Sequence, residues 1–176
     1  MGKGAFKMKK MNTVRFISIG GILTTIAVIF QSAPVFLPAI GLALSPFSTL
    51  PLALAAYFNI SLGITVLFSS VLILTFVSVQ EALILLFTTG LLGIVIGLLY
   101  KKGLFVSILY SAITLSISMI ILTYIMGISV FGDFTGSLSI PTTLIIFILF
   151  SLIYAGIWNI CLKKFVHYLI KIRVLN

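Results

Sequence analysis

Few side chains in this sequence could carry out chemistry. Apart from lysine, arginine and tyrosine, its ionisable side chains are Glu81, Asp133, Cys161 and His167. Acid–base and nucleophilic catalysis need a base held beside an acid or a nucleophile, and four scattered residues supply no such group. A zinc site needs three or four protein ligands. We therefore expect no enzyme activity, no metal and no cofactor, which leaves binding or a structural role.

The composition is that of a chain surrounded by lipid. Of its 176 residues, 61% are hydrophobic and 7% are charged, and the mean hydropathy is +1.37. A soluble domain carries roughly 25% charged residues. One membrane-crossing helix needs about 20 apolar residues, so five or six of them use nearly the whole sequence. The sequence predicts one transmembrane domain of the all-α class over residues 1–176.

The eleven basic residues lie in three groups, and their positions predict the topology. One group precedes the first apolar segment, Lys101 and Lys102 form the second, and the third follows the last apolar segment. Six spans place all three groups on one side, which the positive-inside rule makes cytoplasmic. Both termini are then cytoplasmic, whereas Glu81 and Asp133 lie outside, across the membrane from His167. Because topology explains every basic residue, we expect no nucleic-acid partner.

The predicted spans cover about 13–30, 48–58, 60–79, 82–100, 104–126 and 141–162. The second is short and interrupted by proline, since four of the five prolines and no charged residue fall within Gln31–Phe58. We expect residues 31–47 to form a membrane-embedded outer loop, a candidate lid over a binding site, anchored by the helix at 48–58. The alternative is a rigid apolar plug that only packs.

A pocket under this loop would collect polar side chains from the outer ends of several spans. Ligand pockets are mainly apolar and contain a few well-placed polar groups. The candidate ligand-binding residues are Gln31, Ser32, Phe36, Gln80, Glu81, Tyr124 and Asp133. For the two acids, a solvated turn is the alternative interpretation.

Small residues spaced by four predict close helix contacts in two places. In the first span these residues are Gly20, Gly21, Thr24 and Thr25. They fit either packing within the chain or the docking of a partner helix. In the fourth span, Gly93 and Gly97 form a GxxxG motif, for which we expect packing within the chain.

The arrangement resembles that of the substrate-binding S components of energy-coupling factor (ECF) vitamin transporters. The matching features are a small-rich first helix (SIGGILTTIA, 18–27), a proline-bearing outer loop (33–47), a short helix (PLALAAYFN) and the segment GLLGIVIGLLYKKG (90–103). The last segment is also similar to YybS-like bacterial membrane proteins of unknown function. The resemblance covers most of the chain.

This resemblance implies a multi-pass protein of the bacterial plasma membrane that captures a small, vitamin-like nutrient from outside. Its partners would be a transmembrane coupling subunit and two cytoplasmic ATPases. In that family an Ala-x-x-x-Ala face on the first helix docks the coupling subunit, and the nearest equivalents here are Gly20/Thr24 and Gly21/Thr25. Two other classes stay open: a scaffold like the rod-shape protein MreD, with no small ligand, and a small independent permease.

Overall fold

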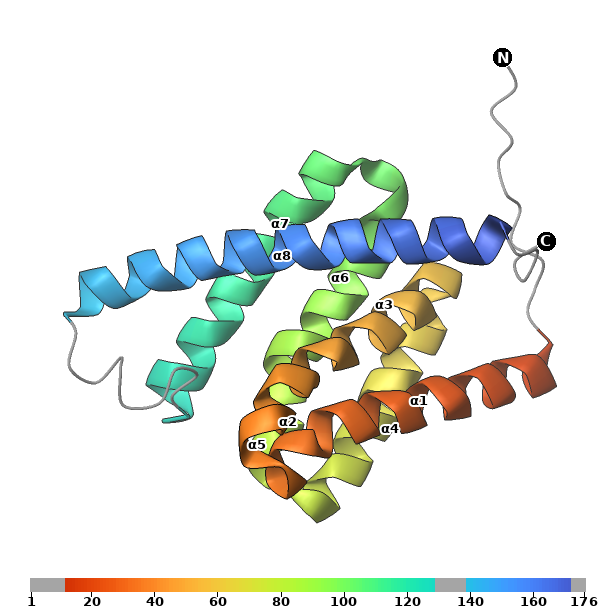
Figure 1. Ribbon diagram of the computed structural model, residues 1–176, viewed down its shortest axis with the longest axis horizontal. Coiled ribbons are helices and arrows are strands. Elements are labelled where there is room, and N and C mark those ends of the chain that lie inside the picture. The colour runs from red at the N-terminus through yellow and green to blue at the C-terminus, as the bar shows by residue number, and fades with distance from the viewer. Residues whose placement is uncertain (1–11, 129–138, 172–176) are drawn as a thin grey trace.

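The computed structural model describes residues 12–128 and 139–171. This part of the chain is helical, with no strand, and six of its helical segments are long and apolar enough to cross a membrane. The protein is therefore an all-α, polytopic membrane protein, as predicted. The first span, α1 (Thr13–Phe36), begins at the same end of the molecule at which the last span ends (Figure 1).

The second span is longer than the sequence predicted, and the predicted outer loop over 31–47 is wrong. Residues 31–36 complete α1, and helix α2 (Pro38–Leu44), the 3₁₀ turn η1 (Ser45–Ser48) and helix α3 (Thr49–Phe58) follow. Together they form one interrupted apolar segment, Pro38–Phe58. Proline is tolerated at the start of a helical segment, where its missing N–H would have no partner. Pro38 and Pro46 occupy such positions, so the prolines divide the helix instead of opening a loop.

The third and fourth spans are joined by a tight turn. Helix α4 (Ile60–Val77) is followed by the single residue Ser78, and α5 (Val79–Ile84) begins directly after it. The fourth span then continues through a π-helical stretch, η2 (Leu85–Gly90), into α6 (Leu91–Leu99) and the 3₁₀ turn η3 (Tyr100–Lys102). A π-helical turn inserts an extra residue into the hydrogen-bond ladder and often occurs at functional sites.

The fifth span contains a second π-helical stretch, and the sixth is the longest of the described helices. Helix α7 (Leu104–Ile120) continues as a second π-helical stretch, η4 (Ile121–Ile125). The final helix α8 (Ile140–Lys171) has 32 residues and ends nine residues beyond the predicted position 162. Lysine is a good helix former, so the basic residues that we expected to follow the span instead extend its helix.

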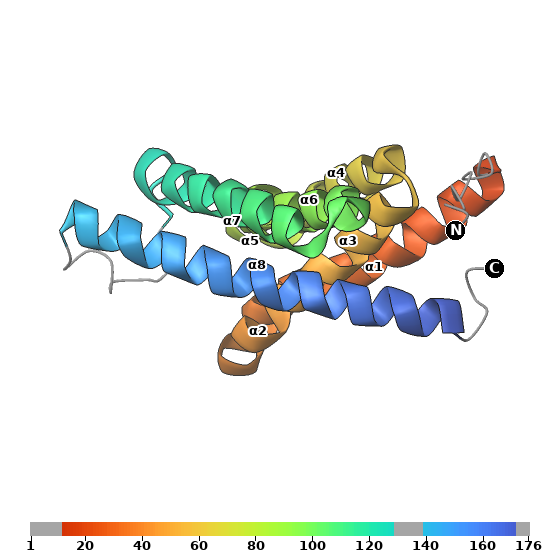
Figure 2. The same cartoon turned by 90° about the horizontal axis from the view of Figure 1, so that it is seen from above.

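Helix α3 lies at the centre of the bundle, packed against α1, α4 and α6, while α8 runs along one side of a layer that contains α4, α6 and α7 (Figure 2). The expected internal packing of the GxxxG motif is confirmed. A Cβ added at Gly93 would meet the Thr49 carbonyl oxygen at 2.8 Å, and one at Gly97 would meet the Ala53 carbonyl oxygen at 2.4 Å. The two glycines therefore allow the backbones of α6 and α3 to touch.

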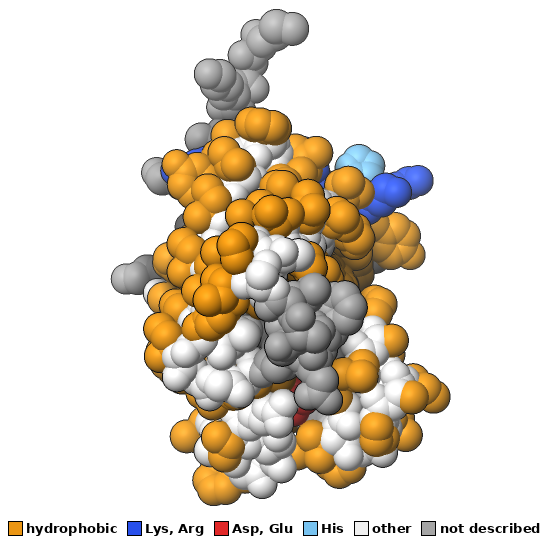
Figure 3. All heavy atoms as spheres, turned by 90° about the vertical axis from the view of Figure 1, so that its left-hand side faces the viewer, with side chains coloured by type: hydrophobic (Ala, Val, Ile, Leu, Met, Phe, Trp, Pro, Cys, Tyr) orange, Lys and Arg blue, Asp and Glu red, His pale blue; other side chains and the backbone are white. Residues whose placement is uncertain are grey.

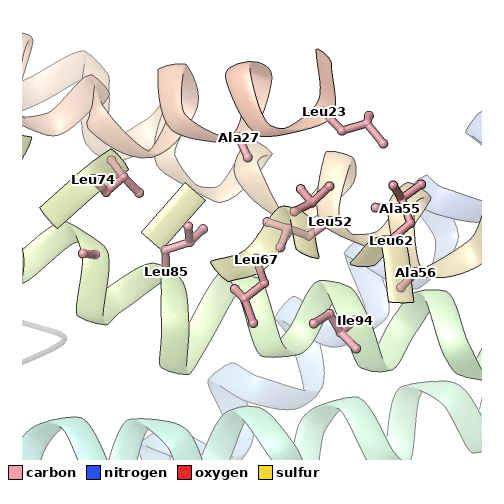
Figure 4. Close-up of a cluster of buried hydrophobic side chains, with 12 residues drawn as sticks. Leu23, Ala27, Leu52, Ala55, Ala56, Leu62, Leu67, Leu74, Leu85 and Ile94 are labelled. Atoms are coloured by element: carbon pink, nitrogen blue, oxygen red, sulfur yellow. The ribbon is translucent and has the colours of Figure 1, made fainter. Parts of the chain in front are cut away.

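Apolar side chains from the other five spans fill the space around α3. Figure 4 shows Leu23 and Ala27 of α1 facing Leu52 of α3, with Leu67 of α4 beside them. A second cluster, which includes Phe147 and Trp158 of α8, packs on the other side of α3. The two clusters hold the six spans together.

Candidate ligand-binding site

Gln31 is the centre of a hydrogen-bonded network that joins four elements. Its side chain is completely buried near the end of α1. Its Nε2 donates to Glu81 Oε2 on α5 at 2.8 Å. Its Oε1 accepts two hydrogen bonds, from Ser48 Oγ at 2.8 Å and from Thr89 Oγ1 at 3.1 Å. A buried amide is costly unless its polar atoms are paired, and here three partners on η1, α5 and η2 pair them.

The turn between α4 and α5 positions Glu81. Ser78 caps α5, and its Oγ accepts a hydrogen bond from the Glu81 backbone N–H at 3.4 Å. This Ser-x-x-Glu pattern is typical of a capping box, and an acidic residue is favourable in a first helical turn. The half-buried carboxylate consequently lies at the start of the fourth span, within reach of Gln31.

The π-helical stretch η2 positions two threonines on the same side of the fourth span. Thr89 donates to Gln31, and Thr88 Oγ1 donates to its own backbone, the Ile84 carbonyl oxygen, at 2.5 Å. Both side chains are buried. The insertion of a π turn rotates the residues that follow it relative to those before it. Here the π-helical stretch contains two hydroxyl groups that point into the bundle from a membrane-spanning segment.

A cavity of about 610 Å³ lies beside this network. Its lining comes from the end of α1, from α2 and η1, from α5 and η2, and from α7 and α8. The polar lining residues are Ser45, Gln80, Glu81, Thr88, Thr89 and Tyr154. The apolar lining residues are Pro34, Leu42, Pro46, Ile84, Leu115, Met119 and Phe150. Figure 3 views the molecule from this end and shows a small acidic area recessed among white and hydrophobic atoms.

The described lining of the cavity contains one charged side chain, and it is acidic. Glu81 is the one acid among its lining residues, and the described lining contains no lysine, arginine or histidine. Its volume lies within the usual range of about 300–1,000 Å³ for small-molecule sites. A single carboxylate in a largely apolar wall can accept hydrogen bonds or balance a positive charge, but it disfavours an anion.

A chain of aromatic rings packs next to the cavity and links α8 to η1. The Phe47 ring of η1 meets the Trp158 ring at 5.5 Å in an edge-on contact. Tyr154 lies 6.0 Å from Trp158 and stacks on Phe150 at 5.4 Å between ring centroids. Such ring pairs stabilise a fixed geometry, so Tyr154 and Phe150 form an ordered aromatic wall.

The structure brings some of the predicted ligand-binding residues together and separates others. Gln80 and Glu81 line the cavity, and Gln31 contacts Glu81 directly. Ser32 is buried but donates to the Ile29 carbonyl oxygen of its own helix at 3.2 Å. Phe36 and Tyr124 are not among the lining residues, and 69% and 48% of their surfaces are exposed. Asp133 lies outside the described residues.

The predicted docking residues of α1 divide into two faces. Gly20 and Thr24 are buried, and a Cβ at Gly20 would meet Leu62 Cδ1 of α4 at 3.3 Å. Gly21 and Thr25 are exposed, and nothing lies within 4 Å of a Cβ built at Gly21. One pair therefore packs within the chain, and the other faces outward.

Sequence reasoning missed several residues of the site: Ser45, Ser48, Thr88, Thr89, Leu115, Met119 and Tyr154. Thr88 and Thr89 carried a usable signal, because adjacent hydroxyls in the middle of an apolar span need an inward partner. The others are ordinary residues for membrane helices, and only the fold brings them together. In the described part of the chain, no group of His, Cys, Asp and Glu side chains could hold a metal ion.

Comparisons with protein-family models, with curated proteins and with solved structures find no match to this chain.

Proposed function

We propose that this membrane protein is the substrate-binding subunit of a transport system and that it holds a small molecule in the 610 Å³ cavity. The proposal is carried by one observation. A ligand-sized cavity and a buried polar network lie side by side at one end of the bundle. Scaffold proteins have no need for such a cavity, and packing alone would fill the space with apolar side chains.

The lining of the cavity indicates the class of ligand. Glu81 and the hydroxyl groups of Ser45 and Tyr154 can pair with hydrogen-bond donors, while Leu42, Met119 and other apolar groups suit an apolar body. An aromatic wall next to a carboxylate also favours a cation, through cation–π attraction. The ligand is therefore uncharged or positively charged, amphipathic and of the size of a vitamin.

Three features support an ECF-type system as the setting. The fold has six spans, as an S component has, and its charge pattern orients the cavity toward the outside of the membrane. The outward face of α1 at Gly21 and Thr25 is free to meet a coupling subunit. In this proposal the protein resides in the bacterial plasma membrane, and two ATPases that act through the coupling subunit supply the energy.

The proposal is tested by thermal unfolding of the purified protein against a panel of vitamins and related amines. A ligand at 100 times its dissociation constant stabilises the folded state by about 2.7 kcal/mol, so a true ligand raises the melting temperature by several degrees. The variant Ser45→Trp, which places a large ring in the cavity, should lose this rise. Ser61→Trp makes the same change at an exposed position on α4 and should keep it.

The outcomes separate the proposed function from its alternatives. A rise that both tryptophan variants retain would mean that the ligand binds elsewhere, and no rise with any compound would favour the scaffold. Uptake by the purified protein alone in liposomes would favour an independent permease over a subunit that needs ATPases.

A further inference from the structure

A second cavity, which is shallow and open and has a volume of about 580 Å³, lies at the opposite, basic end of the molecule. It is lined by Tyr100 of η3 and by Lys163, Lys164, His167, Tyr168 and Lys171 of α8. Helix α8 is about 48 Å long at 1.5 Å per residue, which exceeds the roughly 30 Å of a hydrocarbon core. Its last turns therefore project into the headgroup region.

The lysines of this cavity are gathered on one side of the helix. Lys164, His167 and Lys171 are separated by three and four residues, the spacing that places side chains on one helical face. Within the described residues the one acid is Glu81, which lies at the other end and is bonded to Gln31. No acid among the described residues lies beside these lysines, so they are free to pair with an anion from outside the chain.

Tyr100 forms the facing wall of the cavity and is held by a ring contact. Its centroid lies 4.7 Å from that of Tyr57 in an edge-on arrangement. Tyrosine is enriched at membrane interfaces, where its ring lies at the headgroup level. The cavity therefore presents cationic side chains on α8 and an oriented tyrosine on η3 at the same depth.

Apolar side chains continue from the cavity along the exposed surface of α8. Ile153, Ile157 and Ile160 precede the cavity on the same face of α8 as Lys164, and all three are exposed although they are large and hydrophobic. In a membrane protein such a surface faces acyl chains. We propose that the basic cavity binds the phosphate headgroup of an anionic phospholipid, whose acyl chains lie along α8. Basic pockets between membrane helices on the cytoplasmic side bind anionic headgroups in this way.

Native mass spectrometry of the delipidated protein with added cardiolipin, phosphatidylglycerol or phosphatidylcholine tests this inference. The wild type should hold one cardiolipin or phosphatidylglycerol more tightly than phosphatidylcholine. Replacing Lys163, Lys164 and Lys171 by alanine should weaken anionic-lipid binding on the order of 100-fold. The matched control replaces Arg15, Lys101 and Lys102, three exposed cations outside the cavity, and should change binding by less than about threefold.

Each alternative result would overturn the proposal. Equal loss in the two triple variants would mean diffuse attraction to the whole basic surface. Equal binding of phosphatidylcholine by the wild type, a comparison that needs no variant, would mean that the headgroup charge is not recognised. Displacement of cardiolipin by millimolar inorganic phosphate would mean a site for free phosphate. All three lysines are exposed, so their replacement should leave the melting temperature unchanged.

Discussion

The Gln31 side-chain amide donates a 2.8 Å hydrogen bond to the Glu81 carboxylate, joining two residues that are fifty positions apart in the chain. The bond fixes the end of α1 to the start of α5, and the same amide oxygen holds Ser48 of η1 and Thr89 of η2. The hydrogen bonds of one buried glutamine therefore hold together the wall of the 610 Å³ cavity.

Replacing Gln31 by leucine should destabilise the protein. Leucine has a similar size but leaves Glu81, Ser48 and Thr89 without their shared partner. A buried polar group without a partner costs about 1–3 kcal/mol, and the free energy of unfolding should fall by at least that amount. Unfolding by denaturant in detergent micelles measures the change. The matched control is Gln80→Leu, an exposed neighbour, and an equal loss in both variants would contradict the role of the network.

Two glycine substitutions should have opposite effects on stability, because one glycine lies at the close contact between α6 and α3 and the other does not. Gly97→Ala places a methyl group 2.4 Å from the Ala53 carbonyl oxygen, and overpacking of this kind costs about 1–3 kcal/mol. Gly156→Ala in α8 meets nothing within 4 Å and should stabilise the helix by about 0.5–1 kcal/mol. Unfolding of the two variants under the same conditions compares them, and a Gly97→Ala protein that is as stable as the wild type or more stable would refute the contact.

Replacing glycine by leucine should affect stability differently on the two faces of α1. Gly20→Leu must displace Leu62 of α4 and should lower the melting temperature, whereas Gly21→Leu enters open space and should leave it unchanged. If the outward face docks a coupling subunit, Gly21→Leu should nonetheless abolish uptake in cells that contain the ATPases. Normal uptake by a fully inserted Gly21→Leu protein would rule out docking at this face.

The number of spans, their order and the class of the fold could be predicted from apolar length and the position of basic residues. The predicted loop at 31–47 was wrong, because the sequence alone does not reveal whether a proline breaks a helix or begins one. Pro38 and Pro46 begin helical segments, and Pro51 lies in the first turns of α3 as expected.

The candidate site was only partly predictable. Gln80 and Glu81 stood out because polar residues are rare in this chain, and both line the cavity. The contact between Gln31 and Glu81 depends on how two distant helices pack, and a single sequence contains no record of that packing. The π-helical stretch η2, which accompanies the inward position of Thr89, arises from one extra residue in a continuous apolar run and leaves no visible pattern.

The most direct test of the central claim is native mass spectrometry of the protein purified gently from cells that supply its ligand. We predict one small-molecule adduct per chain on the wild type, absent from Ser45→Trp and weakened in Glu81→Gln, which removes the single carboxylate of the cavity. An adduct that persists undiminished in Ser45→Trp, or no adduct on any form together with no stabilisation by the metabolite panel, would contradict a binding site in the 610 Å³ cavity.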